Sequence, residues 1–255
     1  MSFETPSQRM KNIKNEVQQR LANHEVKELA NTKYVKLYRC SKPTTRIDSF
    51  DIILGPGCIT VSGDIGEVLY TVGKGIEFLA KDGCSCYGLG KLEETYRRKK
   101  EVCDYFIADY LYELIYDHFG LEEIKSDDFP EELKHPSYFK EDNPEDLETA
   151  IDILYFDVVK PLYRNSGKLP KHLGQIEADE KKIAGIYYLL REVREHNYKP
   201  DEYELYSIIE NSILCDLDEC WWECSFTVKS WHVLFVAACA QYAAGRVLEQ
   251  KKEAA

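Results

Sequence analysis

The 255-residue chain lacks most features that would assign a protein to a class at once. Its longest apolar run, residues 231–240, is about half the length that a membrane-spanning helix needs. The first 20 residues contain no apolar signal-peptide core. Neither the G-x-x-x-x-G-K-[ST] phosphate loop nor the G-x-G-x-x-G dinucleotide motif occurs. Basic residues are also too few for a general nucleic-acid binder, because 33 Lys and Arg face 45 Asp and Glu, a net charge of −12.

Cysteine is frequent, but its pattern does not predict disulfides. Nine cysteines are an odd number, which excludes a fully paired framework, so we expect a reducing cytoplasm and buried thiols. A weaker alternative is a zinc site made by Cys215, Cys220, Cys224 and His232, although zinc knuckles usually have two-residue spacings and these are four and three. A catalytic pair of Cys239 with His232 is weaker still. We predict no catalytic residue, no cofactor and no metal.

The acidic charge is concentrated in two tracts. Residues 1–50 have a net charge of +5, whereas residues 121–150 and 201–224 have −8 each. Such tracts are either solvated surfaces or patches that meet a basic partner, such as the DNA-binding surface of a nuclease. The interface candidates in the second tract are Asp201, Glu202, Glu204, Asp216, Asp218, Glu219, Trp221 and Trp222.

Periodicity predicts an α+β protein, with a small antiparallel β-meander near the N-terminus followed by a mainly helical second half. The predicted strands are 33–40, 49–54, 58–62 and 67–72. The predicted helices are 6–30, 74–81, 91–119, 144–163, 179–196, 201–213 and 230–250. The expected organisation is a helical arm at 1–32, the meander with a long helix at 33–120, an acidic connection at 121–143 and a helical subdomain at 144–255.

Glycines are densest in residues 55–66, and two interpretations of them remain open. The preferred one is two structural turns of a hairpin, with Asp64 bonding to nearby backbone. The other is a nucleotide loop, since glycine lets a backbone approach a phosphate. Separately, Asp48, Asp51 and Asp64 could converge on Mg²⁺ as a nuclease would need, although nothing in their spacing forces them together.

Small residues in the last predicted helix also allow two interpretations. They permit another helix to approach closely, either inside the protein or in a self-associating copy. These residues are Ala237, Ala238, Ala240, Ala243, Ala244 and Gly245.

Two groups of motifs resemble a family of phage-encoded accessory proteins. The likeness covers roughly 35–110 and 220–250, and Leu54 departs from it because the family often has Trp there. The motifs are Tyr38-Arg39-Cys40, residues 47–54, Pro56-Gly57-x-Ile59-x-Val61-x-Gly63-Asp64-x-Gly66, and Trp231-His232-Val233-Leu234-Phe235.

Some members of that family are similar to the viral inhibitor of the bacterial Gabija anti-phage defence system. The resemblance implies a non-enzymatic homo-oligomer in the host cytoplasm that covers a nuclease–helicase complex and blocks DNA binding and cleavage. From the acidic composition and the short apolar run, we also expect no direct contact with nucleic acid or membrane. The alternative from the residues is a small phage enzyme that acts on nucleotides or nucleic acid through the 55–66 turns.

Overall fold

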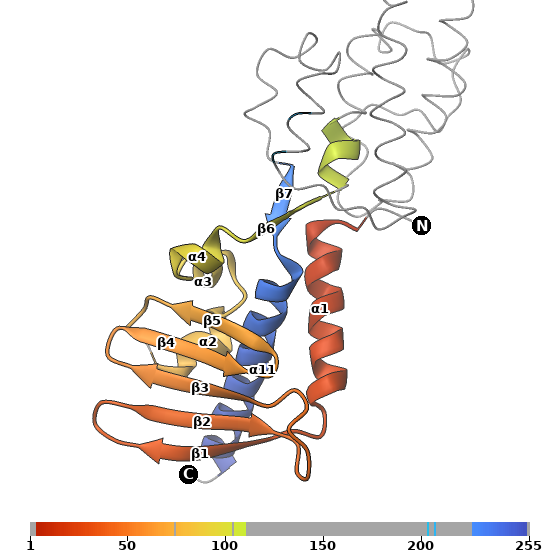
Figure 1. Ribbon diagram of the computed structural model, residues 1–255. Helices are drawn as coiled ribbons and strands as arrows, with labels where there is room; N and C mark the ends of the chain where they lie inside the picture. Colours follow the sequence, from red (N-terminus) through yellow and green to blue (C-terminus); the bar gives the residue numbers. More distant parts are fainter. Residues whose placement is uncertain are drawn as a thin grey trace, which may run out of the picture. The chain divides into compact units, whose positions relative to one another are not determined.

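The computed structural model describes residues 4–73, 75–103, 105–110, 203, 207 and 226–253 (Figure 1). The chain forms two compact units. The first comprises Gln8–Lys100 and Lys229–Ala255, and we call it the sheet unit. The second comprises Met1–Ser7 and Glu101–Val228, and we call it the acidic unit for its composition.

The described elements form an α+β structure, as the sequence predicts. Its strands are β1 Glu25–Asn31, β2 Lys36–Ser41, β3 Phe50–Gly55, β4 Cys58–Gly63, β5 Gly66–Tyr70, β6 Lys100–Val102 and β7 Thr227–Lys229. Its helices are α1 Pro6–Leu21, α2 Ile76–Asp82, α3 Cys86–Leu89, α4 Glu94–Arg97 and α11 Trp231–Glu253.

β1 to β5 form an antiparallel meander in which each strand pairs with its neighbour in sequence. Their side chains alternate between a buried and a more exposed face, as expected for a sheet covered on one side. The register places Ile52 opposite Val61, and Val61 opposite Val68, in a buried row across the middle of the sheet. The predicted meander is therefore confirmed.

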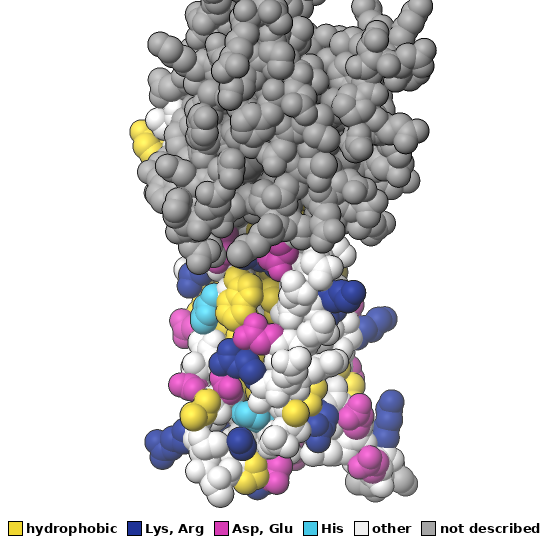
Figure 2. Space-filling model, turned by 90° about the vertical axis from the view of Figure 1, so that its right-hand side faces the viewer, with side chains coloured by type: hydrophobic (Ala, Val, Ile, Leu, Met, Phe, Trp, Pro, Cys, Tyr) yellow, Lys and Arg dark blue, Asp and Glu magenta, His cyan; other side chains and the backbone are white. Residues whose placement is uncertain are grey.

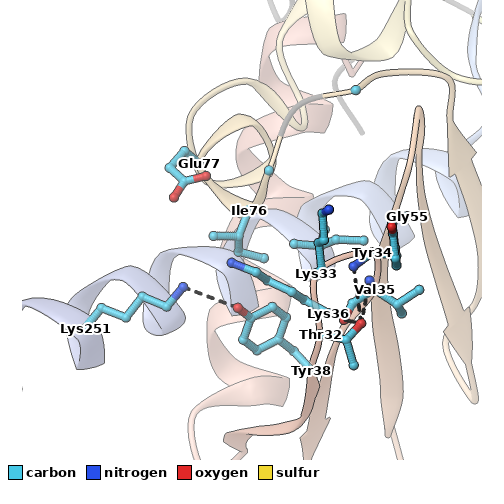
Figure 3. A pocket seen from close by; sticks show the side chains of 13 residues that line it. Thr32, Lys33, Tyr34, Val35, Lys36, Tyr38, Gly55, Ile76, Glu77 and Lys251 are labelled. Carbon is cyan, nitrogen blue, oxygen red and sulfur yellow. Dashed lines mark hydrogen bonds between the residues drawn. The ribbon is translucent and has the colours of Figure 1, made fainter.

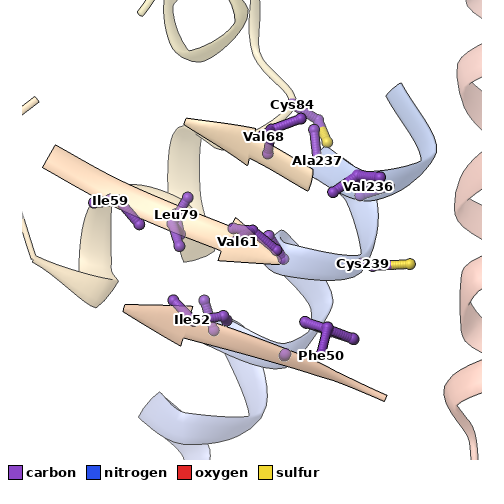
Figure 4. Close-up of a cluster of buried hydrophobic side chains, with 14 of the residues drawn as sticks. Phe50, Ile52, Ile59, Val61, Val68, Leu79, Cys84, Val236, Ala237 and Cys239 are labelled. Carbon is purple, nitrogen blue, oxygen red and sulfur yellow. The ribbon is translucent and has the colours of Figure 1, made fainter. Parts of the chain in front are cut away.

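One face of the sheet carries the helices (Figure 1). α11 packs against α2 and β5, and α1 contributes Ile13, Val17 and Leu21 to the same core. Side chains of the sheet interior meet those of α2 and α11 in a continuous apolar cluster (Figure 4). The alanines at 237, 238, 240, 243 and 244 lie inside this cluster and serve internal packing, whereas Gly245 is only partly buried and lies outside it.

The prediction of one helix over residues 6–30 is wrong in its last third. α1 ends at Leu21, and residues 25–31 form β1, the edge strand that pairs with β2. A helix over 6–30 would bury both Val26 and Leu29. In β1 Val26 is buried, but Leu29 is 51% exposed. Backbone pairing with β2 outweighed local helix propensity in this segment.

The prediction of one helix over residues 91–119 is also wrong at its start. The structure places α4 and β6 in this range, and the helical residues described beyond them are 105–110. The reason is that residues 91–93 extend along β5: the amide of Thr71 donates to Lys91 and that of Glu93 donates to Leu69. Leu92 is thereby buried at 2% exposure.

The predicted helices at 74–81 and 230–250 are confirmed as α2 and α11, within a few residues at their ends. α11 packs on the sheet, although residues 144–255 are predicted to form a separate helical subdomain. The predictions at 121–143, 144–163 and 179–196 lie outside the described residues. Of the helix predicted at 201–213, only Tyr203 and Ser207 are described, both helical.

β6 and β7 form a small two-stranded sheet where the chain passes between its units. The amide of Cys103 donates to Phe226 at 2.8 Å and that of Ser230 donates to Lys99 at 3.0 Å. These two bonds flank the pair and give it an antiparallel sense. The two points where the chain leaves and re-enters the sheet unit are therefore adjacent.

Candidate functional site

The two motif groups of the sequence meet in the sheet unit. Gly66 begins β5 with φ 104°, and a Cβ there would lie 2.3 Å from Nε2 of His232 on α11. Gly63 lies so close to β3 that a Cβ would fall 2.4 Å from the carbonyl oxygen of Ser49. These glycines form the β4–β5 hairpin, which confirms that this part of 55–66 is a structural turn.

Arg20 joins α1 to the same region. Its guanidinium pairs with the carboxylate of Asp48, with Nε donating to Oδ2 at 3.3 Å, and its carbon lies 4.8 Å from the ring centroid of Phe235. Phe235 in turn stacks on Trp231 at 4.8 Å with an interplanar angle of 11°. The aromatic pair of the last motif thus packs on a side chain from the first helix.

The three aspartates that could have held Mg²⁺ are each used otherwise. Asp48 pairs with Arg20, and Oδ2 of Asp64 accepts a hydrogen bond of 2.8 Å from the backbone N–H of Asp48. Asp51 makes a bidentate pair with Arg39, with distances of 2.7 and 2.6 Å. No group of three or more His, Cys, Asp or Glu residues suited to a metal ion occurs in the part of the chain that the structure describes.

The described thiols near the core are held in their protonated form. Burial raises the pKa of Cys40 to about 12 and that of Cys84 to about 12, and it raises the pKa of Cys239 as well. A protonated thiol is a poor nucleophile and a poor metal ligand, so the arrangement does not favour a Cys239–His232 pair. Cys215, Cys220 and Cys224 lie outside the described residues, and the zinc alternative remains a prediction.

A pocket of about 190 Å³ lies in the sheet unit, where β2 begins and β3 ends (Figure 3). The turn between β1 and β2 supplies one wall. Thr32 stabilises this turn, because its hydroxyl accepts hydrogen bonds from the backbone N–H groups of Tyr34 and Val35. The lining residues are Thr32, Lys33, Tyr34, Val35, Lys36, Tyr38, Leu54, Gly55, Gly73, Gly75, Ile76, Glu77 and Lys251.

The pocket is positively charged, since its lining has three lysines and one carboxylate. The side chains of Lys33, Lys36 and Lys251 extend toward the space beside Ile76 (Figure 3). Sequence analysis missed this pocket entirely. The lysines at 33 and 36 flank a recognisable turn, but no local pattern brings the end of the last helix to them.

Charge is divided unequally between the two units. The sheet unit contains 21 Lys and Arg against 13 Asp and Glu, a net charge of +8. The acidic unit contains 12 against 32, a net charge of −20. On the face of the sheet unit seen in Figure 2, both signs of charge are interspersed.

The predicted interface residues of the second acidic tract belong to the acidic unit by sequence, and they lie outside the described residues. They are Asp201, Glu202, Glu204, Asp216, Asp218, Glu219, Trp221 and Trp222. Their role at an interface therefore stays a prediction, and it is consistent with the strongly negative net charge of the acidic unit.

None of the helices in the described ranges is long and apolar enough to cross a membrane. Comparisons of the chain with protein-family models, with curated proteins and with solved structures find no match.

Proposed function

We propose that the chain is a non-enzymatic binding protein that covers a host nuclease–helicase complex, of the Gabija type, and blocks its binding and cleavage of DNA. The observation that carries this proposal is the division of charge, with −20 in one compact unit and +8 in the other. A surface that binds DNA is basic, so a strongly acidic unit is complementary to it.

The second acidic tract suits a contact of this kind. Residues 201–224 combine eight acids with Trp221 and Trp222 and contain no Lys or Arg. Large aromatic side chains often supply most of the binding energy of an interface, while charge steers the encounter.

Homo-oligomerisation is part of the proposal, because a shell around a large complex needs several copies. The opposite charges of the two units allow the acidic unit of one copy to meet the sheet unit of the next. Such a head-to-tail contact closes into a ring when its rotation permits. The mass of the protein alone, measured at low and high salt, tests this part: a monomer at both would contradict it.

The main experiment mixes the protein with a purified Gabija nuclease–helicase complex and measures DNA binding, DNA cleavage and co-elution. We expect stable co-elution and loss of both DNA activities. A triple variant with Asp216→Asn, Asp218→Asn and Glu219→Gln should inhibit at least tenfold less well, because it removes three charges from one tract. Full cleavage in the presence of excess protein would overturn the proposal.

A matched control removes three exposed acids from the sheet unit instead, through Glu25→Gln, Glu249→Gln and Glu253→Gln. It changes the total charge equally, so its inhibition should equal that of the unaltered protein. Equal losses in both triple variants would mean that overall charge, rather than the acidic unit, causes inhibition.

The Asp64→Asn variant distinguishes the enzymatic alternative from the proposed inhibition. Asparagine retains an oxygen that can accept the Asp48 N–H, so the hairpin and the inhibition should persist. Metal-dependent turnover at the 55–66 turns would instead be abolished, because the charged ligand is lost.

A further inference from the structure

We propose that the lysine pocket of the sheet unit, defined by Lys33, Lys36 and Lys251, binds the phosphates of a nucleoside di- or triphosphate. Three ammonium groups line it against the single carboxylate of Glu77. This excess of positive charge favours an anion, and phosphates offer several oxygens to separate lysine donors.

The lysines come from parts of the chain that only the fold brings together. Lys33 and Lys36 flank the β1–β2 turn, and Lys251 lies in the last turn of α11. Gly73 and Gly75 also line the pocket, and the carboxylate of Glu77 lies against Gly75, where a Cβ would fall 2.6 Å from Oε2. A Cβ at Gly73 would meet nothing closer than Gly57 at 3.9 Å.

Lys251 is held at the pocket by Tyr38. Its ammonium donates to the Tyr38 hydroxyl at 3.3 Å and lies 5.6 Å from the ring centroid (Figure 3). Burial, together with a hydrogen bond to Glu28, raises the pKa of Tyr38 to about 12. The hydroxyl therefore stays neutral, and it links Lys251 to the carboxylate of Glu28, so a phosphate would compete with Glu28 for this lysine.

The size of the pocket decides which part of the ligand enters it. Sites for whole drug-sized ligands usually measure about 300–1,000 Å³. At about 190 Å³ the pocket admits a diphosphate group but leaves a nucleobase outside. Tyr34 on the rim is 67% exposed, with Lys33 5.4 Å from its ring centroid, and it offers a face on which a base can stack.

Calorimetric titration of the full chain tests the proposal with ADP, ATP, inorganic pyrophosphate and adenosine. We expect saturable binding of ADP and ATP below about 1 mM and no binding of adenosine. Pyrophosphate should bind about tenfold more weakly than ADP, because it lacks a base to stack on Tyr34.

Variants identify the site. Lys36→Met and Lys251→Met should each weaken ADP binding about tenfold, since each removes a charged donor. Lys252→Met removes the same charge from the adjacent exposed residue of α11 and should leave the affinity unchanged. Tyr34→Ala should weaken ADP but not pyrophosphate, whereas Tyr87→Ala, at another exposed tyrosine, should change neither.

Several outcomes would overturn the proposal. These are the absence of binding by every phosphate compound, ADP binding that survives both lysine substitutions, and equal loss in Lys252→Met. Equal affinity for pyrophosphate and ADP would show that the nucleobase makes no contact that contributes to binding. Tighter binding of a single-stranded oligonucleotide than of ADP would assign the pocket to nucleic acid instead. None of these results bears on inhibition of a nuclease–helicase complex, which is measured separately.

Discussion

Gly63 and Gly66 bound the same hairpin, yet the structure constrains them for different reasons. A Cβ at Gly63 would meet the backbone of Ser49 and Phe50 at 2.4 and 2.5 Å. A Cβ at Gly66 would meet the tip of the exposed His232 side chain, which can rotate away, so its main cost is the φ of 104°. The backbone atoms that a Cβ at Gly63 would meet belong to a paired strand and cannot rotate away.

Gly63→Ala is therefore expected to destabilise the protein more than Gly66→Ala. The first should lower the free energy of unfolding by about 3 kcal/mol or more, and the second by about 1–2 kcal/mol. Urea unfolding followed by circular dichroism checks this order. A larger loss in Gly66→Ala would contradict it and would mean that His232 is fixed in place.

The buried thiols make stability depend on pH in the alkaline range. Cys40 and Cys84 ordinarily have a pKa near 9, and burial raises the pKa of each to about 12 in the folded protein. The raised values mean that folding favours the protonated thiol. The stability that these groups contribute is complete below pH 9 and is lost as pH rises from about 9 to about 12.

The midpoint of thermal unfolding should accordingly fall between pH 9 and pH 11. Cys84→Ala should show a smaller fall over this interval than the unaltered protein, because one of the titrating groups is gone. Cys86→Ala is the matched control, since Cys86 is exposed and its removal should leave the fall unchanged. Identical pH profiles for all three proteins would refute the assignment to buried thiols.

At the scale of elements, α11 depends on small side chains along the face that meets α2 and the sheet. Ala240 is fully buried, whereas a Cβ at Gly245 would meet nothing within 4 Å. Ala240→Leu should lower the free energy of unfolding by about 1–3 kcal/mol through overpacking. Gly245→Ala should raise it by about 0.5–1 kcal/mol, because glycine is a poor helix former and open space receives the methyl group.

The two variants of α11 enlarge a side chain at a buried position and at an open one, and opposite effects on stability are expected. Urea unfolding of both proteins measures the difference. A destabilising Gly245→Ala would indicate that the open side of α11 is covered by another copy or partner.

Local pattern predicted most of the strands and α11 because their residues alternate or repeat with the period of a face buried in one core. It failed at residues 25–31 and 91–103, where the decisive interactions are with β2 and β5 rather than with sequence neighbours. The lysine pocket was missed for the same reason. Lys33 and Lys251 are 218 positions apart, and only the packing of α11 under the sheet brings them to one place.

For the whole molecule, the two-stranded pair of β6 and β7 brings together the two ends of the segment that joins them. Paired strands lie about 4.8 Å apart, so a short loop can join Val102 to Thr227. We expect a chain in which residues 103–226 are replaced by four glycine and serine residues to fold. Its dispersed amide NMR spectrum and its retention on a cation exchanger would verify this, because the remaining unit is basic.

A shortened chain without dispersed amide signals would show that the sheet unit needs the acidic unit in order to fold. The shortened chain also separates the two proposals if it folds. It should keep nucleotide binding, since every residue of the lysine pocket is present. It should lose inhibition of the nuclease–helicase complex, since residues 201–224 are gone.

The position of α11 has a consequence for synthesis on the ribosome. The five strands of the meander leave the ribosome early, but the helix that covers their apolar face comes last, after the whole acidic unit. The buried row of Ile52, Val61 and Val68 therefore lacks the α11 part of its cover while more than 150 further residues are made. We therefore expect nascent chains at this stage to bind chaperones through the apolar surface that α11 later covers, and a product that ends before residue 231 to lack a complete core.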